Sequence, residues 1–325
     1  MNVEVMKVKQ QKLRFKKSSQ LSILTPLIGL ILLIVMYVIA LEGNITSYNL
    51  EILLNQSVIM AVVSIGAIYI FSIGAFDISL GASTAVSAMC GVLVYNQTES
   101  ILMMLITCIL VGVTVGLINS LLAAVFNLPA FVSTIAMLSI LTSITKVLLG
   151  GKSNISMDFA AATAYDTQLI KLIILGTFFG ICYFIFHYTA VGRRNKFLGG
   201  NPISAKQTGI SVVKQTIISF TIAGLGVGLA AFLTITRAPT LSASTASSIG
   251  MDVLIAVVFG GMPVSGGARS RVIAALIGSV SIVLLNQILL IIGASFGMTQ
   301  LIKGLLFLLV VFIAGLGYRT KLLTR

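Results

Sequence analysis

Long runs of apolar residues, separated by short polar segments, dominate the pattern along this chain of 325 residues. About 20 apolar residues are enough to cross the hydrocarbon core of a bilayer as a helix. Helix is the default because lipid offers no partner to an unpaired backbone group, whereas a membrane barrel would show alternating strands of about 10 residues. We therefore predict an all-α integral membrane protein with about ten transmembrane helices. The predicted spans cover residues 21–41, 51–72, 80–96, 100–122, 129–149, 168–188, 215–236, 249–261, 272–292 and 298–316.

Glycine-rich breaks interrupt some of these runs. The eighth run is short, and Gly260-Gly261 and Gly266-Gly267 interrupt the sequence that follows it. A second break, between the second and third runs, is bounded by glycines and contains Asp77. Transporters often build their sites where helices are broken near the membrane centre, so both breaks are of interest.

Composition agrees with a membrane protein and argues against nucleic acid as a partner. The chain is 58% hydrophobic and 9% charged, while a soluble domain usually has about 25% charged residues. The net charge of +13 lies in short clusters between apolar runs, where membrane topology places cations, and not on a face that tracks phosphates. The three cysteines lie singly inside apolar runs and are interpreted as small buried hydrophobes.

The distribution of Lys and Arg predicts the orientation. With ten spans and a cytoplasmic N-terminus, 16 of the 21 Lys and Arg residues lie in inner segments, as the positive-inside rule requires. Both termini are then cytoplasmic. The predicted organisation is a basic tail over 1–20, one transmembrane domain over 21–316 and a second basic tail over 317–325.

The longest predicted cytoplasmic loop, residues 192–212, contains signals for a short helix. Asn201 is a good N-cap and Pro202 suits a first helical turn, so Ile203–Gln207 is predicted as a helix that stops at Gly209. Glycine breaks are expected on both sides of this helix. The residues alone leave two interpretations open: a solvated loop that anchors the topology, or a docking helix for a cytoplasmic partner.

Three stretches resemble one known family. The loop has G-R at 192–193, G-G-N-P at 199–202, Ala205 and G-I at 209–210, and it is similar to the G-R-x-x-x-A-I-G-G-N-P-x-A-A-x-x-S-G-I segment of ribose-type permeases of ATP-binding-cassette importers. Residues 74–81, GAFDISLG, resemble that family's G-G-I-D-L-S-V-G, and residues 251–261, MDVLIAVVFGG, resemble its L-D-A-I-A-A-V-V-x-G-G. The resemblance runs from about residue 50 to 315. Departures at Ala75, Met262-Pro263 and Arg269 leave the substrate class open.

The resemblance implies a function and a set of partners. Two permeases, identical or paralogous, would form the path, two separate ATP-binding subunits would dock below, and an extracytoplasmic solute-binding protein would deliver a small polar solute such as a monosaccharide. The chain would have no ATPase of its own. The residues implied to couple it to the ATPase are Gly199, Gly200, Asn201, Pro202, Ala205, Lys206, Gly209 and Ile210. The alternative is a secondary transporter driven by an ion gradient, which would need an acidic pair or relay inside the spans.

Two acids inside the apolar region are candidates for the translocation path or its gate. Asp77, with Ser79, either caps the third span or lines the path. Asp252 lies in the first turn of the eighth span, where its charge complements the helix dipole or lines the outer mouth.

Amides within the spans are expected to bond across helices or to meet the hydroxyls of a solute. They are Asn55, Gln56, Asn119, Asn286 and Gln287. No acid–base pair stands out in the spans, and no catalytic, cofactor or metal motif is present, so neither a proton relay nor an enzyme is favoured. Gly112-x-x-x-Gly116 suits close helix packing or a subunit contact.

Overall fold

The computed structural model describes residues 25–322. The predicted basic tail over 1–20 lies outside the described residues, as do residues 323–325 of the second tail. Residues 317–322 continue the last helix, so this helix ends six residues beyond the predicted boundary at 316.

Every predicted span coincides with a helix. The helices at these positions are Thr25–Ala40, α2 (Ser47–Ser72), α3 (Leu80–Thr98), α4 (Ile101–Ala124), α5 (Ala130–Leu149), α7 (Gln168–Tyr188), α10 (Val212–Arg237), α11 (Ile249–Phe259), α12 (Ile273–Ile291) and α13 (Phe296–Leu322). Local chemistry sets their starts, because side chains of Thr46, Ser100 and Ser211 accept hydrogen bonds from free backbone N–H groups in the first turns of α2, α4 and α10.

Length and apolarity identify the segments that cross the membrane. Among residues 25–322, six helices are long and apolar enough to span it: α2, α4, α5, α7, α10 and α12. Thr25–Ala40, α11 and Phe296–Leu309 are shorter apolar helices. The chain is therefore a helical multi-pass membrane protein.

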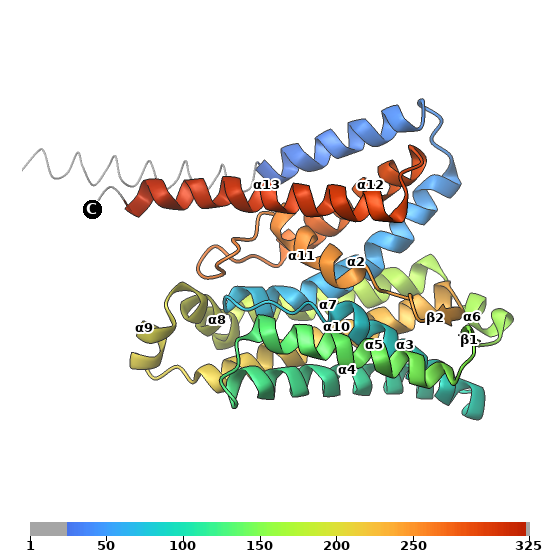
Figure 1. The fold of residues 1–325 in the computed structure, drawn as a ribbon, viewed down its shortest axis with the longest axis horizontal. Coiled ribbons are helices and arrows are strands. Elements are labelled where there is room, and N and C mark those ends of the chain that lie inside the picture. The colour runs from blue at the N-terminus through green and yellow to red at the C-terminus, as the bar shows by residue number, and fades with distance from the viewer. Residues whose placement is uncertain (1–24, 323–325) are drawn as a thin grey trace, which may run out of the picture.

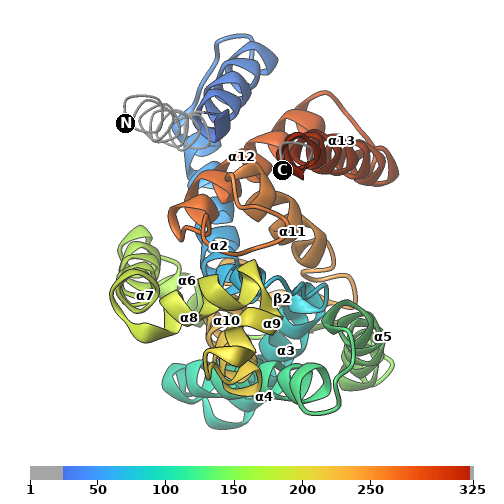
Figure 2. The ribbon, with the colours of Figure 1, turned by 90° about the vertical axis from the view of Figure 1, so that its left-hand side faces the viewer.

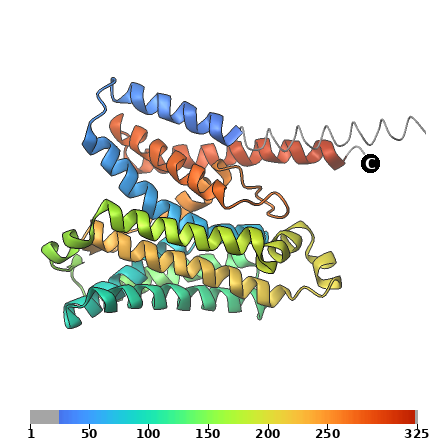
Figure 3. The same ribbon diagram turned by 180° about the vertical axis from the view of Figure 1, so that it is seen from behind.

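The helices form two groups that α2 joins. Viewed along the bundle in Figure 2, α3, α4, α5, α7 and α10 gather on one side, and Thr25–Ala40, α11, α12 and α13 gather on the other. Figures 1 and 3 show α2 running obliquely between the two groups. The main hydrophobic core follows α2, whose residues Val62, Val63 and Ile65 are fully buried.

Small residues bring α4 and α10 into backbone contact. A Cβ atom on Gly112 would lie 2.5 Å from the carbonyl oxygen of Gly224, and one on Gly116 would lie 2.5 Å from that of Phe220. Small residues at such a crossing let helices approach closely in lipid. The Gly112-x-x-x-Gly116 motif therefore serves packing within the chain, as one of its two interpretations predicted.

A small sheet joins two loops at one end of the bundle. Strand β1 (Asn154–Ser156) pairs antiparallel with β2 (Thr240–Ser242), with Ile155 opposite Leu241. The short helix α6 (Phe159–Tyr165) follows β1. Strand pairing supplies partners for backbone groups of the loops after α5 and α10.

Candidate functional site

The loop with the family motif folds into two short helices at the other end of the bundle from the sheet (Figure 1). They are α8 (Ala190–Gly200) and α9 (Pro202–Gln207). Asn201 caps α9, because its side-chain oxygen accepts from the N–H groups of Ile203 and Ser204 at 3.0 and 3.1 Å. Gly209 follows with φ +80°, a conformation that favours glycine. The helix, its cap and its stop are confirmed.

The expected glycine break before α9 is wrong. Gly199 and Gly200 form the last turn of α8, and the chain turns at Asn201. A Cβ atom on Gly199 would collide with the carbonyl oxygen of Ser72 at the end of α2. Gly199 therefore serves close packing, whereas Gly200 has open space where its Cβ would be.

The two faces of α9 differ. Ala205 is fully buried in a cluster with Ile73 and Leu198, and Ile210 packs against it. Ile203 is 72% exposed, and Lys206 is also exposed. The inner face holds the loop to the body of the protein, so only the outer face is free to meet a partner.

Asn195 ties α8 to two other helices, a role that the sequence prediction missed. It is fully buried, and its Nδ2 donates to Ser219 Oγ of α10 at 2.9 Å and to the carbonyl oxygen of Tyr69 in α2 at 3.5 Å. The signal was weak, because Asn195 is one polar residue in a loop segment that also carries Arg193, Arg194 and Lys196.

Asp77 lies in the chain between α2 and α3, in a buried network of neutral donors. It is 4% exposed, and its Oδ1 accepts from the backbone N–H and hydroxyl of Ser79 at 2.8 and 2.6 Å. Asn119 Nδ2 of α4 donates to Asp77 Oδ2 at 3.1 Å and to Ser79 Oγ at 2.9 Å. The carboxylate therefore satisfies a backbone N–H at the start of α3 and also anchors α4.

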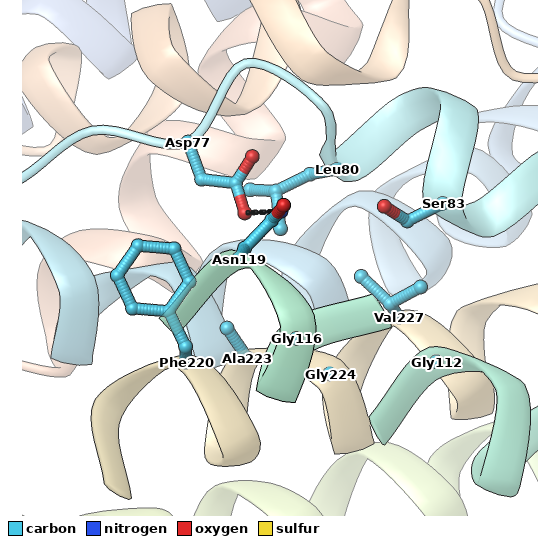
Figure 4. A pocket seen from close by; sticks show the side chains of 10 residues that line it. All are labelled: Asp77, Leu80, Ser83, Gly112, Gly116, Asn119, Phe220, Ala223, Gly224 and Val227. Carbon is cyan, nitrogen blue, oxygen red and sulfur yellow. Dashed lines mark hydrogen bonds between the residues drawn. The ribbon is translucent and has the colours of Figure 1, made fainter. Parts of the chain in front are cut away.

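A small pocket opens beside this network, as Figure 4 shows. Polar side chains of Asp77, Ser83 and Asn119 meet apolar Phe220 and Val227 there. The Oδ1 atom of Asn119 is buried without a hydrogen-bond partner. The lining combines an apolar wall with a few convergent polar groups, but the pocket is much smaller than a typical small-molecule site.

The first and third motif segments touch next to this pocket. A Cβ atom on Gly81 at the start of α3 would lie 2.8 Å from the backbone nitrogen of Gly250 at the start of α11. A Cβ atom on Gly250 would in turn collide with the carbonyl oxygen of Ile78. The start of α3 and the start of α11, which directly precedes the 251–261 motif, are thus in direct backbone contact.

Asp252 is held by a cation. Lys303 Nζ of α13 lies 2.7 Å from Asp252 Oδ1, and both side chains are almost fully buried. Asn286 Nδ2 of α12 donates to Asp252 Oδ2 at 3.3 Å. The expectation that the spans contain no acid–base pair is therefore wrong. The partners are 51 residues apart in sequence, so no local pattern pairs them.

The other amides also bond across helices, as one of their two interpretations predicted. Gln287 Nε2 of α12 donates to Gln56 Oε1 of α2 at 2.8 Å. Asn55 Oδ1 of α2 accepts from Lys171 Nζ at 2.8 Å, and Lys171 also lies 2.6 Å from Asp166. Lys171 is thus a second buried lysine with an acidic partner.

Within residues 25–322, no group of three or more His, Cys, Asp or Glu side chains is placed to hold a metal ion.

Comparison with known proteins identifies the family. Residues 49–311 match the family described as branched-chain amino acid transport system / permease component. The chain belongs to this family. The match covers the three motif segments and all helices from α2 to α12 in full or nearly so. The chain is therefore a permease of the cell membrane.

Several curated relatives are sugar permeases. The chain is 28% identical to the ribose import permease protein of Bacillus subtilis strain 168, over 96% of this chain and 98% of the relative. It is 25% identical to the ribose import permease protein of Escherichia coli strain K12, over 88% and 92%. It is 25% identical to the fructose import permease protein of Rhizobium meliloti, over 88% and 83%. No solved structure matches the chain.

Proposed function

We propose that this permease is the membrane-spanning subunit of an ATP-driven importer for a monosaccharide. Relatives that cover nearly the whole chain carry ribose and fructose import in their names, which favours a sugar over other small polar solutes. In this proposal the chain lacks an ATPase and works with a separate ATP-binding subunit, an extracytoplasmic solute-binding protein and a second permease copy or paralogue in the lipid bilayer.

One observation carries the proposal: a short capped helix with an exposed apolar residue is fixed to the end of a central membrane helix. α9 exposes Ile203, while Ala205 and Leu198 hold it to Ile73, the residue directly after α2. A solvated loop would need neither the buried anchor nor the exposed isoleucine.

The proposed topology has ten spans with both termini in the cytoplasm. It places α8 and α9 on the cytoplasmic side, where an ATP-binding subunit is found. It also places the β1–β2 sheet and α6 outside, where a solute-binding protein would dock.

Alternating access is the proposed mechanism. Closure of the two ATP-binding subunits would push α9, and α2 would carry that displacement toward Asp77, Ser79 and Asn119. We propose these three as part of the path or its gate, because their donors and acceptors lie beside a pocket at the broken start of α3. For Asn55, Gln56, Asp252, Asn286 and Gln287, we propose that they fix the helices around the path, since each bonds across helices.

A transporter driven by an ion gradient is the less favoured interpretation. Two ion pairs with buried lysines exist, Lys303 with the buried Asp252 and Lys171 with the partly exposed Asp166, yet each carboxylate has its own cation and the two pairs are on different helix groups. The relatives are import permeases, so the comparisons favour the ATP-driven importer.

Cysteine crosslinking tests the docking of α9. Cys90, Cys108 and Cys182 are first replaced by Ala, and Ile203→Cys is then oxidised in the complete complex with single cysteines on the ATP-binding subunit. We expect a crosslink from position 203 and none from the control Lys152→Cys, which is exposed at the opposite end of the bundle. Failure of Ile203→Cys and of Lys206→Cys to crosslink would overturn the docking proposal.

The substrate is tested in proteoliposomes that contain the complete importer. Uptake of labelled ribose, fructose and galactose is measured with ATP enclosed, and with an ion gradient but no ATP. We expect ATP-dependent uptake of at least one sugar. Uptake that follows the ion gradient without ATP would support the secondary transporter instead.

A further inference from the structure

The last turn of α2 is enclosed by the backbones of two segments that are distant in sequence. The N–H of Gly267 donates to the carbonyl oxygen of Ser72 at 3.0 Å. Gly199 of α8 lies against the same carbonyl, and a Cβ atom there would be 2.7 Å from the nitrogen of Gly267. A Cβ atom on Gly266 would meet the nitrogen of Gly74 at 2.8 Å. We call this contact of residues 72–74, 199–200 and 265–267 the glycine junction.

The junction joins three parts of the molecule through main-chain atoms. It links α8 and α9 to the end of α2 and to the loop between α11 and α12. Side chains can change rotamer to absorb a displacement, whereas backbone atoms in van der Waals contact cannot. Close-packed interiors pass strain on, so a push on α8 reaches the other two segments directly.

Two further contacts hold α8 to the same end of α2. Asn195 bonds the carbonyl oxygen of Tyr69, and Leu198 packs with Ile73. The free carbonyls at a helix end need partners, and here a distant segment supplies one of them. The attachment of α8 to α2 therefore combines hydrogen bonds, apolar packing and direct backbone contact.

The junction also lies a few residues from the candidate path. Gly74 has φ +79° and begins the segment that leads to Asp77. Its Cβ position is 3.3 Å from the carbonyl oxygen of Ser265. A displacement of the junction therefore moves the chain that carries the Asp77 carboxylate.

We propose that α8, α9, the end of α2 and the loop over 262–271 move as one body during transport, with Gly199 as the positioning residue that lets them touch. This inference rests on the proposed docking of α9 on an ATP-binding subunit. It adds that the push from that subunit reaches the Asp77 segment and the α11–α12 loop together, through main-chain contact at Gly199.

Two helical glycines provide a matched test. Gly199→Ala forces a Cβ into the backbone of α2, while Gly176→Ala in α7, outside the junction, adds one into open space. Neither glycine has a positive φ, so the two variants differ in the contact and not in backbone strain. Both are measured in the complete importer in proteoliposomes, as sugar taken up per ATP hydrolysed.

We expect Gly199→Ala to lower uptake per ATP about tenfold, within the usual range of coupling between two sites, and Gly176→Ala to leave it unchanged. The crosslink from position 203 to the ATP-binding subunit should persist in Gly199→Ala. The same sugar uptake per ATP hydrolysed in the two variants would overturn the inference. Absence of the crosslink in the wild-type background would instead overturn the docking proposal on which it rests.

A second measurement keeps Gly199 in place, in case Gly199→Ala does not fold. Spin labels are attached at Gly200→Cys and Arg269→Cys, both exposed positions next to the junction, in the background without native cysteines. We expect the same distance distribution in the ATP-free and ATP-trapped complex, because the two segments move together. A distance that changes between these states would overturn the inference.

Discussion

The regions around Asp77 and Asp252 each stabilise a buried carboxylate, but they do so in opposite ways. Both carboxylates are buried in a protein whose surroundings are lipid, where a charge is costly. Asp252 is neutralised by Lys303 at 2.7 Å, whereas Asp77 receives hydrogen bonds from Ser79 and Asn119 and has no cation within reach among the described residues.

We expect this difference to separate a structural role for Asp252 from a functional role for Asp77. A buried pair of opposite charges fixes α11 to α13 and has little reason to open, since separating the partners leaves two unpaired charges. Bonds from neutral donors can be exchanged for bonds to another polar group. We therefore expect Asp77, with the unpartnered Oδ1 of Asn119 beside it, to be the carboxylate whose hydrogen bonds a solute hydroxyl can replace once the path opens.

The packing of the helices around the two carboxylates also differs. α4 and α10, next to Asp77, are packed backbone to backbone through glycines. α13, next to Asp252, is held by its ion pair and by packing of Ile302, Leu306 and Phe307 against the core, while it exposes large apolar residues such as Leu305, Leu308 and Phe312. Close backbone contact is the main feature of the region around Asp77, and an ion pair is the main feature of the region around Asp252. Substitutions of the glycines and of the ion pair therefore test the two regions separately.

The largest effect is expected from Lys303→Met, which leaves Asp252 buried without its cation. Removing one partner of a buried pair costs about 3–5 kcal/mol. We expect the purified variant to lose its monodisperse peak in size-exclusion chromatography after mild heating. The neutral double variant Asp252→Asn/Lys303→Met should recover most of the stability, and a single variant as stable as the wild type would contradict the structural role.

Gly112→Ala should have the next largest effect, because its Cβ meets the backbone of α10. Overpacking of this kind costs about 1–3 kcal/mol. The same heating assay measures it. Gly176→Ala is the control, since that glycine of α7 has open space at its Cβ position. Similar stability of the two variants would mean that α4 and α10 do not depend on close contact.

Asp77→Asn should preserve the fold and impair transport. The amide oxygen of the variant would still accept from Ser79, and Asn119 can rotate its amide to offer the free oxygen. A hydrogen bond from a solute hydroxyl to a carboxylate contributes about 1.5–3 kcal/mol, whereas one to a neutral amide contributes about 1 kcal/mol. We therefore expect sugar uptake to fall about tenfold while thermal stability stays normal. The double variant Asp252→Asn/Lys303→Met is the comparison and should transport better. Normal uptake by Asp77→Asn would leave this residue with its capping role alone.

The smallest effect is expected at the Gln56–Gln287 hydrogen bond between α2 and α12. Amide bonds between membrane helices contribute about 0.6 kcal/mol on average. A double-mutant cycle with Gln56→Leu and Gln287→Leu measures this coupling from thermal stability in detergent. A coupling of zero would show that the two amides do not bond in the protein.

The sequence by itself determined the helices. Continuous apolar runs, capping residues and glycines predicted a helix at each apolar run, together with α9, its Asn201 cap and its Gly209 stop, although the last helix runs six residues further and α6 and α8 were not predicted. These features are local, since a helix needs only its own hydrogen bonds and its own apolar length. The motifs also indicated the family, because their spacing along the chain is itself local information.

Only the tertiary structure decided which residues meet. Asp252 and Lys303 are 51 residues apart, Gln56 and Gln287 are 231 apart, and Gly199 reaches the end of α2 across more than a hundred residues. The sequence offered Gly199-Gly200 as a break, yet the structure uses Gly199 as a contact and extends α8 through both. Such pairings depend on how whole helices pack against one another, and packing within lipid depends on small differences in shape that no single segment of sequence contains.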